Sequence, residues 1–240
     1  MTIFKGNFTP IEIENANKEF NRIIDSLKSN KIFNSYFSDL DIKGKTKTII
    51  GFDNLDEETP GETTRNNNNG DRYIFLNSSI YYEIKKVFTK LVNNKKNLSG
   101  KDVLYINIFV HEYLHNRQTY LFTLKGFSRN LSEGLTEIIA QKYTNNFLEA
   151  YCGKSFEKVL NKSFIYKDIV GIIKPLLEKF NILQFNKLDK FIYKDIESML
   201  CRINHNNIRE EFVVIMNGYD KKLSALTMVN LKRKLDYRYK

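Results

Sequence analysis

Residues 101–118 read KDVLYINIFVHEYLHNRQ. The pattern predicts a helix over this range that is apolar on nearly every side between Val103 and Val110, and we expect such a helix to run through the core. It continues into HEYLH, residues 111–115, which would put three titratable side chains deep in the protein. Burying them is costly unless they are paired, hydrogen-bonded or bound to a metal.

The spacing of HEYLH favours the metal. His111 and His115 are four residues apart, so their side chains leave one helix face a single turn from each other and can converge on one ion. Glu112 lies beside them and can reach a water molecule without being a ligand. Two of the three histidines in the chain belong to this pentapeptide. The alternative is that these three side chains hydrogen-bond to one another or to the backbone.

A hydrolytic zinc site needs a third protein ligand and one open position, and the segment downstream offers carboxylates for it. Glu133 is expected at the start of the next helix, with Glu137 one turn later on the same face. One can bind the metal while the other accepts the remaining imidazole N–H. Because Asn130 and Glu133 also fit a capping box, Glu137 as the ligand and Glu133 as the cap is the second possibility.

The segment Leu104–Tyr143 resembles the gluzincin branch of zinc metallopeptidases, in which an HExxH helix is followed by a helix that carries a glutamate ligand. The residues that match are HEYLH, 111–115, and EGLTE, 133–137. The resemblance implies zinc bound by His111, His115 and Glu133, with Glu112 as the general base and Glu137 as the acid behind the ligands. A metzincin would instead require a histidine where Leu121 stands.

The flanking sequence predicts an α+β, zincin-like fold with a small twisted sheet, the HExxH helix and a helix-rich C-terminal half. We expect one domain over 1–240, with the sheet and the metal-binding helices in 1–150 and a helical subdomain in 151–240. Strands are expected at 46–52 and 72–77, joined by a polar surface loop over 53–71. Further helices are expected over 11–27, from a cap at Ser79, from a cap at Asn130 or Ser132, and from Ser155 onward with Pro175 between helices.

Other site residues are suggested less directly. The strand 72–77 is predicted either as the upper edge of the sheet, where Ile74, Phe75 and Leu76 would pair with an extended substrate, or as an ordinary internal strand. Asn116 and Gln118 would line the site or end the helix. A donor to the developing oxyanion is also expected. Its candidates are His205, Tyr219, Arg209 and Tyr120.

The function predicted from these residues is hydrolysis of a peptide or protein substrate by a zinc-activated water, with a glutamate as general base. The alternative is a basic helical binding module for nucleic acid or an acidic protein, with a non-catalytic histidine cluster. It draws on 38 Lys and Arg against 28 Asp and Glu, a net charge of +10. These charges are spread along the chain and fit the codon usage of an AT-rich genome, so nucleic acid is not the expected partner.

Three features of the sequence bear on where the protein is located in the cell. The residues after Met1 do not read as a signal peptide, and no apolar run approaches the roughly 18 residues of a membrane span. The expected location is cytoplasmic, or delivered or secreted without a legible signal. The segment 220–239 predicts a basic amphipathic helix, which would bind a membrane or partner or pack on its own domain.

Overall fold

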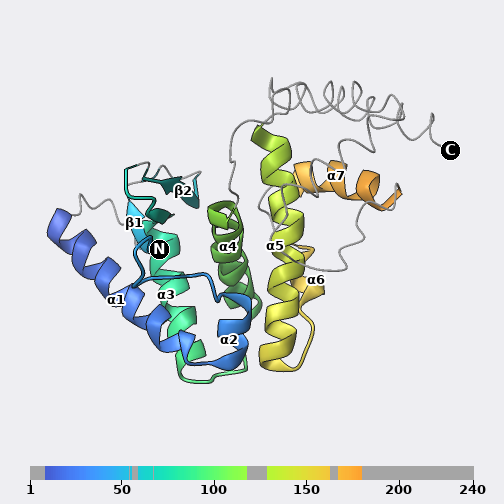
Figure 1. Cartoon of the computed structure of the whole chain (residues 1–240). Helices are drawn as coiled ribbons and strands as arrows, with labels where there is room; N and C mark the ends of the chain where they lie inside the picture. The colour runs from blue at the N-terminus through green and yellow to red at the C-terminus, as the bar shows by residue number, and fades with distance from the viewer. Residues whose placement is uncertain are drawn as a thin grey trace. The chain divides into compact units, whose positions relative to one another are not determined.

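The computed structural model describes residues 9–53, 55, 59–66, 68–117, 129–162 and 167–179. Its elements in chain order are α1 (Pro10–Lys28), α2 (Lys31–Tyr36), β1 (Thr48–Asp53), β2 (Gly61–Arg65), β3 (Arg72–Asn77), α3 (Ser78–Val92), α4 (Gly100–Arg117), α5 (Arg129–Cys152), α6 (Glu157–Leu160) and α7 (Lys167–Lys179) (Figure 1). A small sheet accompanied mostly by helices confirms the α+β class.

The chain forms two compact units. The first comprises Met1–Arg117 and Ala140–Ser163, and the second comprises Gln118–Ile139 and Phe164–Lys240. The boundary falls inside α5, which is one continuous helix. Within the second unit the start of α5 lies against α7, because a Cβ built on Gly134 would be 2.3 Å from Cγ2 of Ile169.

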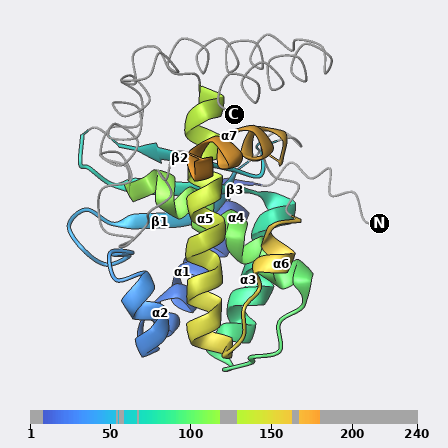
Figure 2. The same ribbon diagram turned by 90° about the vertical axis from the view of Figure 1, so that its right-hand side faces the viewer.

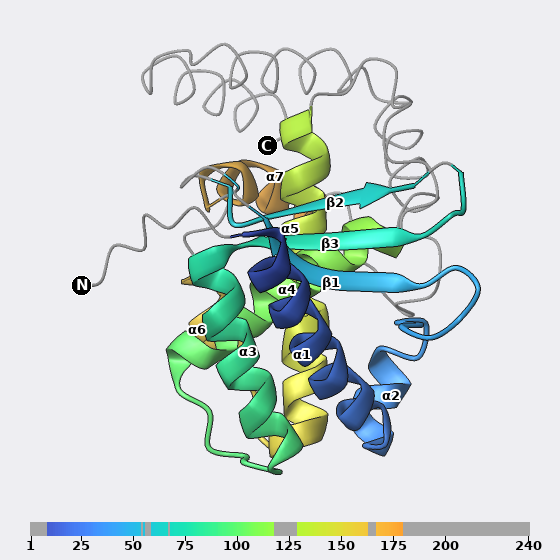
Figure 3. The same ribbon diagram turned by 90° about the vertical axis from the view of Figure 1, so that its left-hand side faces the viewer.

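The sheet in the first unit has the order β1-β3-β2, so β3 is its middle strand (Figure 3). β1 is parallel to β3 and β2 is antiparallel to it. Ile74 and Leu76 of β3 are fully buried, as the period of two along a strand requires when one face covers a core. The expected strands are therefore confirmed, but the segment expected to be only a loop contains β2.

The outer edge of β1 is occupied by side chains of α1. The Asn21 amide donates a hydrogen bond to the carbonyl of Ile50 at 3.0 Å, and the Asn17 side-chain oxygen accepts one from the N–H of Phe52 at 3.2 Å. Covering an edge in this way prevents it from pairing with another strand. Over the described residues, no strand pairs with the side of β2 that faces away from β3.

Helix α4 runs through the core of the first unit, as its apolar surface predicts. All but a few of its residues from Asp102 to Asn116 are buried. Phe109 packs edge-to-face on Phe88 of α3, with ring centroids 4.8 Å apart, and contacts Phe37, which follows α2, at 6.0 Å. Helix α4 also contacts α6 (Figure 2). The helix is thus held from several sides, which restricts movement of the side chains that it carries.

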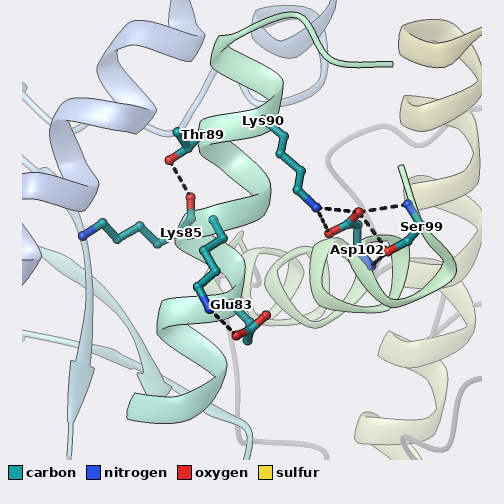
Figure 4. A network of polar contacts seen from close by, with 7 residues as sticks. Glu83, Lys85, Thr89, Lys90, Ser99 and Asp102 are labelled. Carbon is teal, nitrogen blue, oxygen red and sulfur yellow. Dashed lines mark hydrogen bonds and ion pairs between the residues drawn. The ribbon is translucent and has the colours of Figure 1, made fainter. Parts of the chain in front are cut away.

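The first turn of α4 is fixed by a polar network (Figure 4). Asp102 accepts hydrogen bonds from the N–H and the hydroxyl of Ser99, both at 2.9 Å, and its own N–H donates to the Ser99 hydroxyl at 3.2 Å. This is a capping box with aspartate in the third position. Lys90 of α3 donates to both carboxylate oxygens, at 2.7 and 2.9 Å. The network therefore ties the start of α4 to α3.

Three predicted helix boundaries are wrong. Helix α3 is capped by Asn77 and not by Ser79, because the Asn77 side chain accepts a hydrogen bond from the Ser79 N–H at 3.1 Å. Helix α5 begins at Arg129, so Asn130 and Ser132 lie within it and not at its cap. Helix α7 continues through Pro175, at the cost of one backbone hydrogen bond. Among the described residues, no helix is both long and apolar enough to cross a membrane.

Candidate metal centre

The two histidines of α4 point their rings at a common position. Nε2 of His111 and Nε2 of His115 are 3.1 Å apart, and both side chains are almost completely buried. Two nitrogen ligands on a tetrahedral zinc ion, each about 2.05 Å from it, would be roughly 3.3 Å apart. The pair therefore fits a shared metal ion with little adjustment. Without a metal, the same geometry lets one imidazole N–H donate to the other ring.

Glu133 of α5 completes a group of three metal-binding side chains. One ligand atom each from His111, His115 and Glu133 lies within 4.8 Å of the other two. Two imidazoles and one carboxylate are a donor set of catalytic zinc sites, which keep a further position open for water. Glu137, one turn later, is fully buried and is not part of this group. Of the two predicted alternatives for the third ligand, the geometry thus favours Glu133.

Glu112 lies outside the ligand group and packs against β2. The Thr63 hydroxyl is 3.0 Å from Oε2 of Glu112 and 3.0 Å from its main-chain oxygen, and it donates to these acceptors. A Cβ built on Gly61 would be 2.7 Å from Cγ of Glu112 and 2.9 Å from Cδ and Oε1. The glycine is required here because the carboxylate arm occupies the space that any side chain would need.

The opposite face of α4 is anchored by a phenol and an ion pair. Tyr113 donates to a carboxylate oxygen of Asp39, and Arg117 Nε lies 2.8 Å from the other oxygen. Burial raises the pKa of Tyr113 well above its ordinary value and that of Tyr143, which bonds to the Tyr36 carbonyl, to about 12. Both phenols therefore stay protonated near neutral pH. Tyr113 ties α4 to Asp39, and Tyr143 ties α5 to α2.

The C-terminal end of α4 is attached to β3. Arg72 donates to the carbonyl of Asn116 at 3.2 Å, and the Asn116 amide donates to the carbonyl of Tyr73 at 3.4 Å. A cationic side chain at a helix C-terminus is also favoured by the helix dipole. Asn116 therefore joins α4 to the sheet and lies within the helix, whose described part runs to Arg117.

Of the two predictions for residues 72–77, the ordinary internal strand is confirmed and the sheet edge is wrong. The proposed pairing of Ile74, Phe75 and Leu76 with a substrate is wrong with it. β3 is the middle strand, and Phe75 is in register with Gly51 on one side and Glu62 on the other. β1 and β2 therefore already occupy both edges of β3 with which a peptide would have to pair. The prediction failed because the intervening strand β2 was not recognised.

Gly61 and Thr63 are the site residues that the sequence analysis missed. The segment GETTR has no apolar residue to mark a strand, so the alternation that predicts strands is absent. A signal was nevertheless present. Two β-branched threonines precede the Asn69-Gly70 pair, and Asn-Gly before an alternating strand is typical of a hairpin turn. Gly70 has φ of 74°, in the left-handed region that favours glycine, and lies in the connection that the Asn66 N–H closes by donating to the Asp71 carbonyl at 2.8 Å.

The four candidate oxyanion donors, His205, Tyr219, Arg209 and Tyr120, lie outside the described residues. The same holds for Gln118 and for the basic segment 220–239. The structure does not test the predictions for these residues. Comparison of the chain with models of protein families, with curated proteins and with solved structures gave no match. Its function therefore has to be inferred from the chemistry of the site.

Proposed function

We propose that this protein is a zinc-dependent peptidase with a zincin-like arrangement. The observation that carries the proposal is that His111, His115 and Glu133 each place one ligand atom within 4.8 Å of the other two. Glu112 follows His111 directly in α4 and is not part of this group. Zinc bound by such ligands lowers the pKa of a coordinated water toward neutrality and polarises a carbonyl. Glu137, buried one turn after Glu133, is proposed to support the ligands.

In this chemistry the protein itself contributes proton transfer. Glu112 takes a proton from the attacking water and passes it to the nitrogen of the leaving amine. Its anchoring against β2 supports this role, because a general base has to be held within hydrogen-bond reach, about 2.6–3.2 Å, of the atom that carries the proton. The packing around α4 also keeps bulk water away from the histidines, both of which are buried.

The substrate strand in this proposal is β2 instead of β3. Over the described residues its outer edge is unpaired, Thr63 and Gly61 on one of its faces contact Glu112, and α1 covers the opposite edge of the sheet. An extended peptide that pairs with β2 would have its carbonyl groups close to the general base. The proposed substrate is accordingly a peptide or an unfolded segment of a protein.

The first test is the metal content of full-length protein purified without a histidine tag. We expect about one zinc per chain, and a chelator should remove it together with hydrolysis of fluorescein-labelled casein. His115→Ala should lose both the zinc and the activity. If the protein contains no zinc and binds none when it is added, the metal site is wrong and the histidines are hydrogen-bonded to each other.

The second test separates metal binding from catalysis. Glu112→Gln should retain zinc and lose hydrolysis, because the amide cannot accept the proton. Wild-type activity in Glu112→Gln would contradict the peptidase even with zinc present. The alternative of a basic binding module predicts nucleic-acid or acidic-protein binding that weakens steeply with salt and is unchanged by both substitutions.

A further inference from the structure

We propose that Thr63 is a positioning residue that holds the Glu112 carboxylate, an inference that rests on the proposed peptidase function. The Thr63 hydroxyl lies 3.0 Å from two oxygens of the same residue, the main-chain O and Oε2 of Glu112. A hydroxyl carries a single hydrogen, so the bond is shared between the helix and the carboxylate. Thr63 thereby links the side chain of the base to the helix that bears it.

The second contact comes from two residues earlier on the same strand. Residues i and i+2 of a strand face the same side, so Gly61 and Thr63 both face Glu112. Gly61 leaves the space that Cγ and Cδ of Glu112 fill, and Thr63 holds Oε2. The last torsion of a glutamate is otherwise broad, and these two contacts restrict it.

This arrangement gives Thr63 a role that its bulk alone cannot supply. Valine has the same shape as threonine without the hydroxyl, so Thr63→Val keeps the packing and removes the hydrogen bond. Hydrogen bonds to charged groups correspond to factors of roughly 10 to 150 in an equilibrium, and we expect kcat to fall about tenfold or more. KM and zinc content should be nearly unchanged, because the substitution alters neither the ligands nor the main-chain groups of β2 that would pair with the substrate.

The experiment compares full-length wild type, Thr63→Val, Thr63→Ser and Thr89→Val, using an internally quenched peptide that the wild type cleaves. Thr89 is an exposed threonine of α3 whose hydroxyl donates to the carbonyl of Lys85 in the same helix, so Thr89→Val controls for loss of a hydroxyl elsewhere. We expect Thr63→Ser to recover most of the kcat lost in Thr63→Val. Wild-type kcat in Thr63→Val, or equal losses in the valine and serine variants, would overturn the proposal.

A readout that does not need activity separates this inference from the peptidase itself. Crystal structures should show the Glu112 carboxylate displaced from β2 in Thr63→Val and retained in Thr63→Ser. A carboxylate that keeps its position in Thr63→Val overturns the inference even if the peptidase is real. If the wild type cleaves no peptide, the peptidase fails, and the same structures still decide the role of Thr63. Thr63→Ala makes the same comparison should the valine variant not fold.

Discussion

Replacing Gly61 with alanine should disturb Glu112 directly. The added Cβ would lie 2.7 Å from Cγ and 2.9 Å from Cδ and Oε1 of Glu112. The optimal separation of two nonbonded carbon atoms is about 3.5–4.0 Å, so the distance between the added Cβ and Cγ is too short by roughly 1 Å. Since Cγ is close to the backbone of α4, the carboxylate arm cannot avoid the contact by moving its tip alone. Either Glu112 changes rotamer or β2 moves away.

The cost to stability follows from two opposing effects. Extra atoms in a packed site cost about 1–3 kcal/mol, whereas Gly→Ala stiffens the unfolded chain and returns about 0.4–1 kcal/mol. We therefore expect a free energy of unfolding lower by about 1 kcal/mol. Hydrolysis should suffer more, because displacing a catalytic group by about 1 Å costs on the order of 100-fold in rate.

The assay measures urea unfolding by far-ultraviolet circular dichroism, zinc content and peptide hydrolysis on the same preparations. Gly171→Ala is the matched control, since a Cβ at that helical position would meet nothing within 4 Å. It should raise the free energy of unfolding by about 0.5–1 kcal/mol and leave hydrolysis unchanged. Wild-type stability and activity in Gly61→Ala would refute the reasoning, because Glu112 could then not be packed against β2.

Two further predictions concern the helices that carry the site. Asp102→Asn should lower the free energy of unfolding by about 2 kcal/mol at pH 7, measured by urea titration. The control Glu83→Gln removes an exposed ion pair with Lys86, and its free energy of unfolding should stay within about 0.5 kcal/mol of the wild-type value. Burial works to raise the pKa of Asp102, but hydrogen bonds from Lys90 and Ser99 outweigh it and leave the pKa below its ordinary value. The contribution is therefore present above about pH 4 and is lost as the pH falls through the folded-state pKa, so stabilities of wild type and Asp102→Asn measured across acid pH should converge. Gly134→Ala should be destabilising by about 1–3 kcal/mol in urea unfolding, opposite in sign to Gly171→Ala, because its Cβ would collide with Ile169 and Ile173; a stabilised variant would contradict the packing of α5 on α7.

Local patterns predicted the long helices of the first unit well, whereas the short helix α2 was not predicted. The apolar spacing placed α1, α3 and α4 to within one or two residues of their observed ends, because the apolar residues of a helix that packs on a core recur at helical spacing along the sequence. The caps were harder. Asn77 and Ser79 are both good capping residues, and only the path of the chain out of β3 decides which side chain reaches the first free N–H.

The sheet could not be assembled from its strands alone. β1 and β3 were recognised because they are apolar and β-branched, but nothing in either segment states which lies in the middle. β2 is polar along its length, and it is held by pairing with β3 and by contact with Glu112, both distant in sequence. Such a strand carries no periodic signal of its own, so its omission also misplaced the substrate strand.

By itself, the sequence determined the helical pair His111 and His115 and the presence of Glu112 between them, since one turn of helix fixes which side chains share a face. Tertiary structure decided the rest. It brought Glu133 and not Glu137 into the histidine group, and it set a glycine and a threonine against the carboxylate. Spacing along one helix is a local property, whereas the meeting of two helices and a strand depends on how their surfaces pack.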